Sequence, residues 1–169
     1  MKKGFTLVEL LAVVLIIGVL MGLGIPQYRK VIDRARVAEA ESMMRALYDS
    51  SERLASDFGY RSFQDLQTAK GNISIRRFDM FDASRLPKGC VIDGSNPETL
   101  KCTRFWYRVN MRGADGKDYV VAKLVKGNHK DTYIMLRRDD TTLYCQASAA
   151  STDFCGMLGL DLVGSGFVF

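Results

Sequence analysis

The sequence predicts an α+β protein in which one long N-terminal helix packs on an antiparallel β-sheet of three to four strands. Two patterns carry this prediction. Residues 5–25 form a nearly uninterrupted apolar run, and residues 26–58 continue it with apolar side chains that recur at helical spacing. Residues 104–146 instead alternate between apolar and polar side chains and are rich in β-branched and aromatic residues.

The apolar run covers residues 5–25 and contains a single charged side chain, Glu9. At ~1.5 Å of rise per residue, about 20 helical residues cross the apolar core of a bilayer. A secretory signal peptide has a shorter apolar stretch followed by a small-residue cleavage site, and no such site follows Ile25. The run is therefore predicted to be a membrane span that stays in the mature protein. Glu9 is its unusual residue: either assembly supplies a cationic partner for this carboxylate, or the carboxylate stays hydrated near the cytoplasmic headgroups.

The helix is predicted to continue past Pro26, because apolar side chains recur with a period near 3.6 residues. Gly59 follows the last of them and is a plausible end of the helix. A helix over residues 5–58 is ~80 Å long. The predicted apolar stripe consists of Tyr28, Val31, Ile32, Ala35, Ala38, Met43, Met44, Leu47, Leu54, Ala55 and Phe58.

Gly22, Gly24 and Pro26 weaken the helix where it leaves the predicted span, since glycine lowers helix stability and proline removes an intrahelical hydrogen bond. Gly18 and Gly22 have the spacing that lets two membrane helices approach closely. They are equally well explained as part of the weak stretch.

Residues 59–103 are predicted to be irregular, with a segment at 73–78 that is compatible with a short strand. Strands are expected at 104–111, 119–125, 132–138 and 142–146, joined by short turns that make neighbours antiparallel. In the first of these strands one face is expected to cover the helix stripe. That face holds Phe105, Tyr107, Val109 and Met111.

The four cysteines indicate an oxidising compartment. They are even in number and fall into two close pairs, and with no Cys-x-x-Cys and one histidine a zinc site is poorly supported. We expect the bridges Cys90–Cys102 and Cys145–Cys155. Charge alone leaves the orientation open, because Lys2 and Lys3 favour a cytoplasmic N-terminus while four basic residues follow the span; the cysteines place the second part outside the cytoplasm.

Residues 3–10 read Lys-Gly-Phe-Thr-Leu-Val-Glu-Leu, and this segment resembles the processing site of type IV pilins and the related pseudopilins. The resemblance covers the leader and the whole apolar run. It implies that a prepilin peptidase cleaves after Gly4 and that the new N-terminal residue, Phe5, is N-methylated. It also implies that Glu9 neutralises the N-terminal amine of a neighbouring subunit in a filament, and that the stretch ending at Pro26 partly melts on assembly.

The resemblance implies a pilin fold and a structural, non-enzymatic subunit of a type IV pilus-like filament that needs no cofactor. Its expected partners are copies of itself, the peptidase, an inner-membrane platform and a cytoplasmic ATPase. Before assembly the chain would lie in the inner membrane with a periplasmic head, and afterwards in an extracellular pilus. The alternatives are a type II secretion pseudopilin of a periplasmic pseudopilus, a DNA-uptake or adhesive minor pilin, and a membrane-anchored binding or enzymatic domain with a borrowed N-terminus.

The predicted organisation has five parts: a leader (1–4), a transmembrane and assembly helix (5–26), an amphipathic helix (27–58), a connecting region (59–103), and the sheet with a disulfide-bounded C-terminal region (104–169). Lys plus Arg number 24 and Asp plus Glu 19, so the formal charge is +5. Loss of Lys2 and Lys3 with the leader lowers it to +3. A surface of mixed charges is therefore expected.

No strong catalytic or metal-binding pattern is present. His129 is interpreted as a solvated turn residue, and residues 115–118 as a hairpin turn that lacks the spacing of a calcium loop. A calcium site at Asp139, Asp140 and Asp153 is only weakly supported. Single-stranded DNA could stack on and neutralise one strand face, but an ordinary alternating strand explains the same residues: Arg104, Trp106 and Arg108, with Arg76 and Arg77 upstream.

Overall fold

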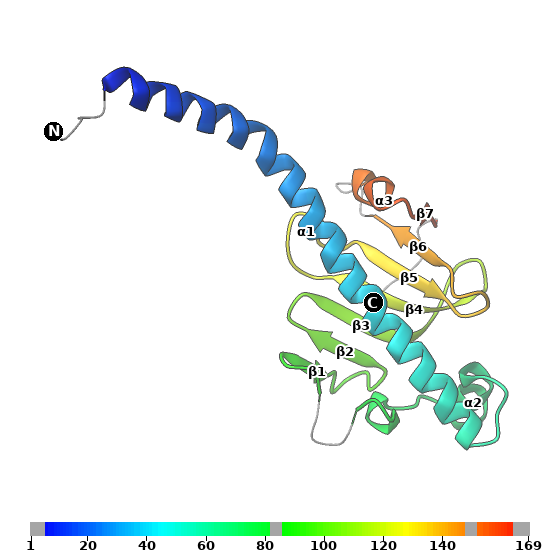
Figure 1. Cartoon of the computed structure of the whole chain (residues 1–169). Helices are drawn as coiled ribbons and strands as arrows, with labels where there is room; N and C mark the ends of the chain where they lie inside the picture. The colour runs from blue at the N-terminus through cyan, green and yellow to red at the C-terminus, as the bar shows by residue number, and fades with distance from the viewer. Residues whose placement is uncertain (1–5, 82–85, 148–151, 164–169) are drawn as a thin grey trace. The chain divides into compact units, whose positions relative to one another are not determined.

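The computed structural model describes residues 6–81, 86–147 and 152–163 and divides into two compact units. The first unit covers Met1–Arg36 and the second Val37–Phe169. One helix, α1 (Leu7–Asp57), contributes to both units, and the remaining elements belong to the second (Figure 1). They are α2 (Phe63–Lys70), the 3-10 helix η1 (Ile75–Arg77), β1 (Cys90–Ile92), β2 (Thr99–Cys102), β3 (Phe105–Arg112), β4 (Asp118–Leu124), β5 (Tyr133–Arg137), β6 (Leu143–Gln146), α3 (Thr152–Leu158) and β7 (Asp161–Leu162).

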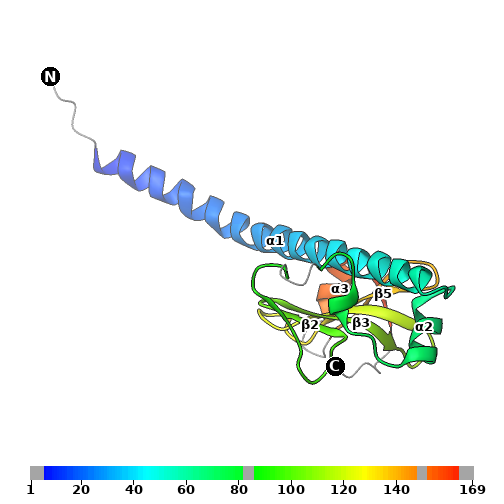
Figure 2. The ribbon, with the colours of Figure 1, turned by 90° about the horizontal axis from the view of Figure 1, so that it is seen from below.

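The second unit is a helix laid on one face of a sheet, which confirms the predicted α+β class (Figure 2). The sheet has seven strands in sequence order, β1 to β7, more than the three to four expected. Neighbours are antiparallel except β6 and β7, which are parallel. The extra strands are two to four residues long, too short for their alternation to stand out in the sequence.

Helix α1 ends where the sequence predicts. Gly59 has a φ of 78°, and the bonds Tyr60 N–H to Ala55 O (2.9 Å) and Gly59 N–H to Ser56 O (2.9 Å) form a Schellman cap. Its buried stripe, however, starts later than predicted, although Met44, Leu47 and Ala55 are buried as expected. Tyr28 and Val31 are exposed, and the buried residues are Val37, Ala40, Met44, Leu47, Ser50, Ser51 and Ala55.

The region between α1 and the predicted sheet is more regular than expected. Ser62 caps α2 by accepting the Asp65 N–H (3.2 Å), a signal present in the sequence but missed. The segment compatible with a strand instead forms η1, because Ser74 accepts the Arg76 N–H (3.3 Å) and Ile75 is drawn into the core.

Strand β3 places Phe105, Tyr107 and Val109 against the helix, as predicted, but not Met111. The pairing with β4 shifts register between Arg108 and Met111. A β-bulge of this kind turns the side chains beyond it to the other face. Met111 therefore packs with Tyr119, Val121 and Met135 on the face away from α1.

An ion pair between the buried Arg138 and the half-buried Glu52 ties α1 to the sheet. The Arg138 guanidinium donates to Glu52 Oε1 (2.6 Å), to Ser51 Oγ (3.0 Å) and to the Val109 carbonyl (2.9 Å). The second carboxylate oxygen of Glu52 accepts the Phe63 N–H at the start of α2 (3.1 Å). Burial lowers the pKa of Arg138, and the charge of Glu52 opposes that shift. Three elements thus share one desolvated network.

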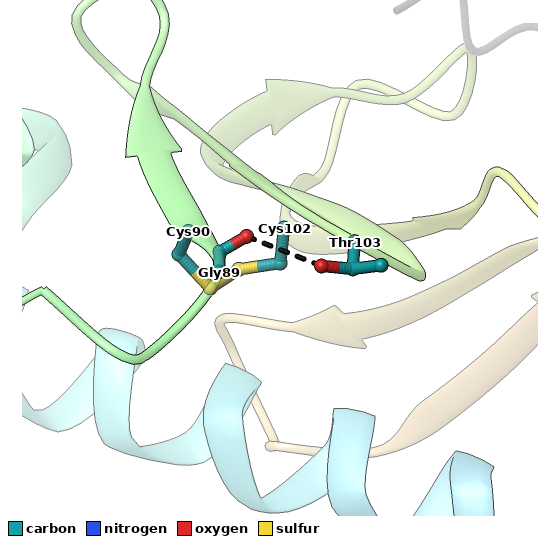
Figure 3. Close-up of a disulfide and its surroundings, with 4 residues drawn as sticks. All are labelled: Gly89, Cys90, Cys102 and Thr103. Carbon is teal, nitrogen blue, oxygen red and sulfur yellow. Dashed lines mark hydrogen bonds between the residues drawn. A yellow bond between two sulfur atoms is a disulfide. The ribbon is translucent and has the colours of Figure 1, made fainter.

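Both disulfides in the structure are local in sequence. Cys90 bonds to Cys102, which stand opposite each other on β1 and β2, and Cys145 on β6 bonds to Cys155 on α3. Figure 3 shows the first bridge beside a turn in which Thr103 Oγ1 donates to the Gly89 carbonyl (3.4 Å). Bridges that close loops of this length contribute about 2–4 kcal/mol of stability.

We call the second unit, Val37–Phe169, the head. Arg138→Met is expected to lower its free energy of unfolding by about 3–5 kcal/mol, because the Glu52 carboxylate loses its buried partner. The control is Arg53→Met. Arg53 pairs with Asp79 (2.6 Å) where both side chains are 56% exposed, so little change is expected. Denaturant unfolding of the full chain in detergent measures both; equal losses from the two variants would contradict the assigned role of the buried pair.

Gly89→Ala is expected to destabilise the same unit by about 1–2 kcal/mol. Gly89 has a φ of 82°, and an added Cβ would lie 2.9 Å from Thr103 Oγ1. Gly94→Ala is the matched control, because open space surrounds that position. Thermal unfolding should separate the two, and a Gly89→Ala midpoint equal to that of the parent chain would refute the strain argument.

Candidate functional site: the processing and assembly segment

The first described turn of the chain is a reciprocal cap built by Thr6 and Glu9. Thr6 Oγ1 accepts the Glu9 N–H (3.3 Å), and Glu9 Oε2 accepts both the Thr6 N–H (2.9 Å) and the Thr6 hydroxyl (2.8 Å). This is a capping box, which satisfies backbone donors at a helix start. Glu9 thus has a local structural role that the Thr-x-x-Glu spacing could have indicated, alongside the charge role that the resemblance implies.

The predicted cleavage and methylation positions, Gly4 and Phe5, lie outside the described residues. They precede the first helical residue, Leu7, by no more than three positions. The Gly4–Phe5 junction is therefore next to the Thr6–Glu9 cap in sequence, and its processing stays a prediction.

Beyond the cap, α1 presents apolar side chains on every side. The large apolar residues of positions 7–25 are each between 45% and 78% exposed. This stretch makes α1 long and apolar enough to cross a membrane. The residues concerned are Leu7, Val8, Leu10, Leu11, Val13, Val14, Leu15, Ile16, Ile17, Val19, Leu20, Met21, Leu23 and Ile25.

Pro26 lies inside α1, and the helix continues through Gly22 and Gly24. Proline lacks the N–H that would bond to the carbonyl four residues earlier, so the turn from Gly22 to Pro26 is one hydrogen bond short. The glycine Cβ positions face open space. A shallow apolar depression surrounds Gly24 and is lined by Ile17, Leu20, Met21, Gly24, Ile25 and Tyr28.

The two units divide the predicted site residues between them. Glu9 and Pro26 belong to the first unit, and the four cysteines to the second. Within the residues that can be described, no group of three metal-binding side chains is gathered. Asp139 pairs with Lys117 (2.5 Å) and Asp140 with Arg137, so two of the three aspartates of the weakly supported calcium site hold cationic side chains.

His129 differs from the prediction of a solvated turn residue. It is half-buried, and its ring stacks on Phe154 with centroids 4.2 Å apart. The apolar ring of Phe154 gives the imidazole a packing partner that the local sequence does not show. Residues 115–118 do form the turn between β3 and β4, where Asp115 accepts the Lys117 N–H (3.0 Å) and the Tyr119 hydroxyl (2.6 Å).

The arginines considered for DNA binding do not gather in one place. Ile75 of η1 donates its N–H to the Pro97 carbonyl (3.0 Å) in the turn between β1 and β2. That turn and the turn between β2 and β3 are at opposite ends of β2. Arg76 and Arg77 therefore attach to one end of the sheet, whereas Arg104 lies at the other.

Comparison with known proteins agrees with the N-terminal geometry. Residues 1–25 match the family model described as "Prokaryotic N-terminal methylation motif". The chain is 34% identical to the type IV major fimbrial protein FimA of Dichelobacter nodosus over 108 residues, which is 55% of this chain and 66% of that protein. No solved structure matches the chain.

Two further relatives match over a shorter part of this chain. A fimbrial protein of Pseudomonas aeruginosa is 47% identical over 30% of this chain and 33% of its own length. The type IV major pilin protein PilA of Myxococcus xanthus (strain DK1622) is 40% identical over 33% of this chain and 26% of its own length. The matched part thus spans less than two thirds of each of these three curated relatives.

A methylation motif at the N-terminus, a long apolar helix and an antiparallel-rich sheet occur together with similarity to fimbrial and pilin proteins. The chain is therefore similar to type IV fimbrial and pilin proteins and carries their N-terminal methylation motif.

Proposed function

We propose that this chain is a structural subunit that polymerises through its N-terminal helix into a type IV pilus-like filament. The observation that carries the proposal is the exposed apolar surface of residues 7–25, which needs either lipid or other helices around it. Lipid covers it before assembly, and equivalent helices of neighbouring subunits cover it in the filament. The depression around Gly24 is a place where a neighbouring helix can approach closely.

A pilus subunit is preferred to a secretion pseudopilin. The relatives at hand are described as major fimbrial or pilin proteins, and the chain matches one of them well beyond the shared N-terminal helix. In this proposal the head lies in the periplasm and then on the fibre surface. A prepilin peptidase processes the subunit, and an inner-membrane platform with a cytoplasmic ATPase drives assembly. The subunit itself performs no covalent chemistry.

Glu9 has two roles in the proposal, at two stages. In the free subunit it caps α1 through Thr6. In the filament its carboxylate neutralises the methylated amine of Phe5 from an adjacent subunit. Both charged groups enter a bundle with little water, where an unpaired charge is strongly unfavourable, so each stabilises the other only if subunits are offset along the fibre.

Processing is tested by the intact mass of the mature protein. It should lack Met1 to Gly4 and carry one additional methyl group on Phe5. Gly4→Val should block cleavage and leave the unprocessed chain in the membrane. A mature protein that still begins at Met1 would remove the main support for the proposal.

The charge role of Glu9 is tested by comparing Glu9→Ala with Glu9→Gln. Glutamine keeps a side-chain oxygen that can accept the Thr6 N–H but carries no charge. If neutralisation of the amine is essential, both variants should be processed, accumulate in the inner membrane and yield few sheared fibres.

Fibre yields for Glu9→Gln close to the parent, with loss only in Glu9→Ala, would assign Glu9 a capping role alone. Normal yields from both variants would mean that this carboxylate is a hydrated residue at the membrane edge. Leader removal serves as the control in each case, because making the span more apolar should not hinder insertion.

A further inference from the structure

One end of the sheet in the second unit carries a concentration of basic side chains. We call it the basic end and define it by residues 87–89, 103–104 and 125–132. Two hydrogen bonds hold these segments together: Thr103 Oγ1 to the Gly89 carbonyl (3.4 Å; Figure 3) and Val125 N–H to the Arg104 carbonyl (2.9 Å). The exposed cations of the basic end are Lys88, Arg104, Lys126 and Lys130.

Few acids accompany these cations. Asp131, in the loop between β4 and β5, pairs with Lys123 (3.1 Å). Asp153 is exposed on α3, next to Phe154, which stacks on His129 of the same loop. Among the described residues, the basic end with Lys123 therefore has five basic side chains, and the acids close to it are Asp131, Asp153 and Glu39 of α1.

The opposite end of the sheet is different. Its turns at 112–118 and 137–142 hold four aspartates and three basic side chains, apart from the buried Arg138 that pairs with Glu52. Several of these groups pair with each other, as in Lys117–Asp139 and Arg137–Asp140. Among the described residues of these segments, positive charge is thus in excess at the basic end and not at the opposite turns.

The basic end is also the end at which α1 enters the second unit. Tyr107, near the start of β3, lies close enough to Glu39 for that carboxylate to help raise the tyrosine pKa, although burial is the larger cause. Farther along β3, the Val109 carbonyl and Arg138 meet Ser51 and Glu52 of α1. The basic end therefore lies at the same end of the sheet as the N-terminal part of α1 within this unit, around Glu39. In the sequence, this part of α1 follows the apolar span.

From this placement we infer that the basic end binds the anionic headgroups of the membrane in which α1 is anchored, before the subunit enters a filament. The inference rests on the membrane anchoring of the proposed function. The head is tethered to the membrane span through the chain, so weak attraction of several cations to phosphate-bearing lipids acts at high local concentration. Nucleic acid is the less favoured partner. Arg76 and Arg77 lie at the other end of the sheet, and Lys101 of β2 already pairs with Asp93 (2.9 Å).

Amine acylation read by mass spectrometry tests the inference on the mature full-length chain. The protein is reconstituted in phosphatidylcholine vesicles and in matched vesicles in which a third of the lipid is phosphatidylglycerol. Acylation of Lys88, Lys126 and Lys130 should slow several-fold in the anionic vesicles and recover in high salt. Lys70 and Lys117, which are exposed elsewhere on the same unit, should react equally in both.

A pair of variants provides the matched control. The double variant Lys126→Gln, Lys130→Gln should lose most of the protection of Lys88 in anionic vesicles, whereas Lys117→Gln should retain it. Equal acylation of Lys88 in the two kinds of vesicle would overturn the inference. So would protection of the same lysines by single-stranded DNA or inorganic phosphate, added to phosphatidylcholine vesicles, that equals the protection by phosphatidylglycerol.

These outcomes are separable from those of the proposed function. A chain that floats with both kinds of vesicle and assembles into fibres, yet shows no lipid-dependent protection, contradicts the inference alone. A chain that floats with neither contradicts membrane anchoring and the inference together.

Discussion

The apolar side chains of residues 7–25 must be kept out of water, and no described residue of the chain covers them. Fourteen large apolar residues, each about half or more exposed, correspond to roughly 20 kcal/mol of unfavourable hydration. This hydration free energy is larger than the whole folding stability of a typical domain, about 5–15 kcal/mol. This surface therefore needs an external apolar environment, which in the proposed function is first lipid and then other copies of the chain. The same helix fits both lipid and a bundle of helices, because its backbone hydrogen bonds are made within the helix and its surface is apolar.

The proposed function sets a different requirement for the head, which has to stay folded while α1 passes from lipid into the filament. Its stability is concentrated where α1 meets the sheet, through the buried stripe and the network of Glu52 and Arg138. The disulfides close the two margins of the sheet, at β1–β2 and at β6–α3. The core, the ion-pair network and the disulfides thus hold the head together, while the apolar side chains of residues 7–25 stay exposed. This arrangement is consistent with a subunit whose head stays folded as it enters a filament.

The sequence alone predicts what rests on long-range periodicity. The extent of α1, its end at Gly59 and the four strands from residue 104 onward follow from patterns that repeat over many residues. Features that depend on a single local event were missed. The bulge after Arg108 sends Met111 to the far face, and β1 and β2 are recognisable only once they pair. The α1 stripe was also predicted to start too early: Tyr28 and Val31 suit a buried stripe by composition but are exposed, whereas Met44 and Leu47 are buried as expected. At the N-terminus the motif indicated Glu9, and the structure adds the hydrogen bonds of Thr6, which a capping-box search could have found.

The central claim is that the exposed surface of residues 7–25 is buried by copies of the same helix. A cryo-electron microscopy reconstruction of fibres sheared from cells that express this chain tests it most directly. The account predicts a core of packed helices in which residues 7–25 contact only equivalent residues of other subunits, with Phe5 of one subunit beside Glu9 of another and the disulfide-bonded heads outside. Fibres whose core is formed by the heads, or an N-terminal helix that remains in lipid while the heads assemble, would contradict it.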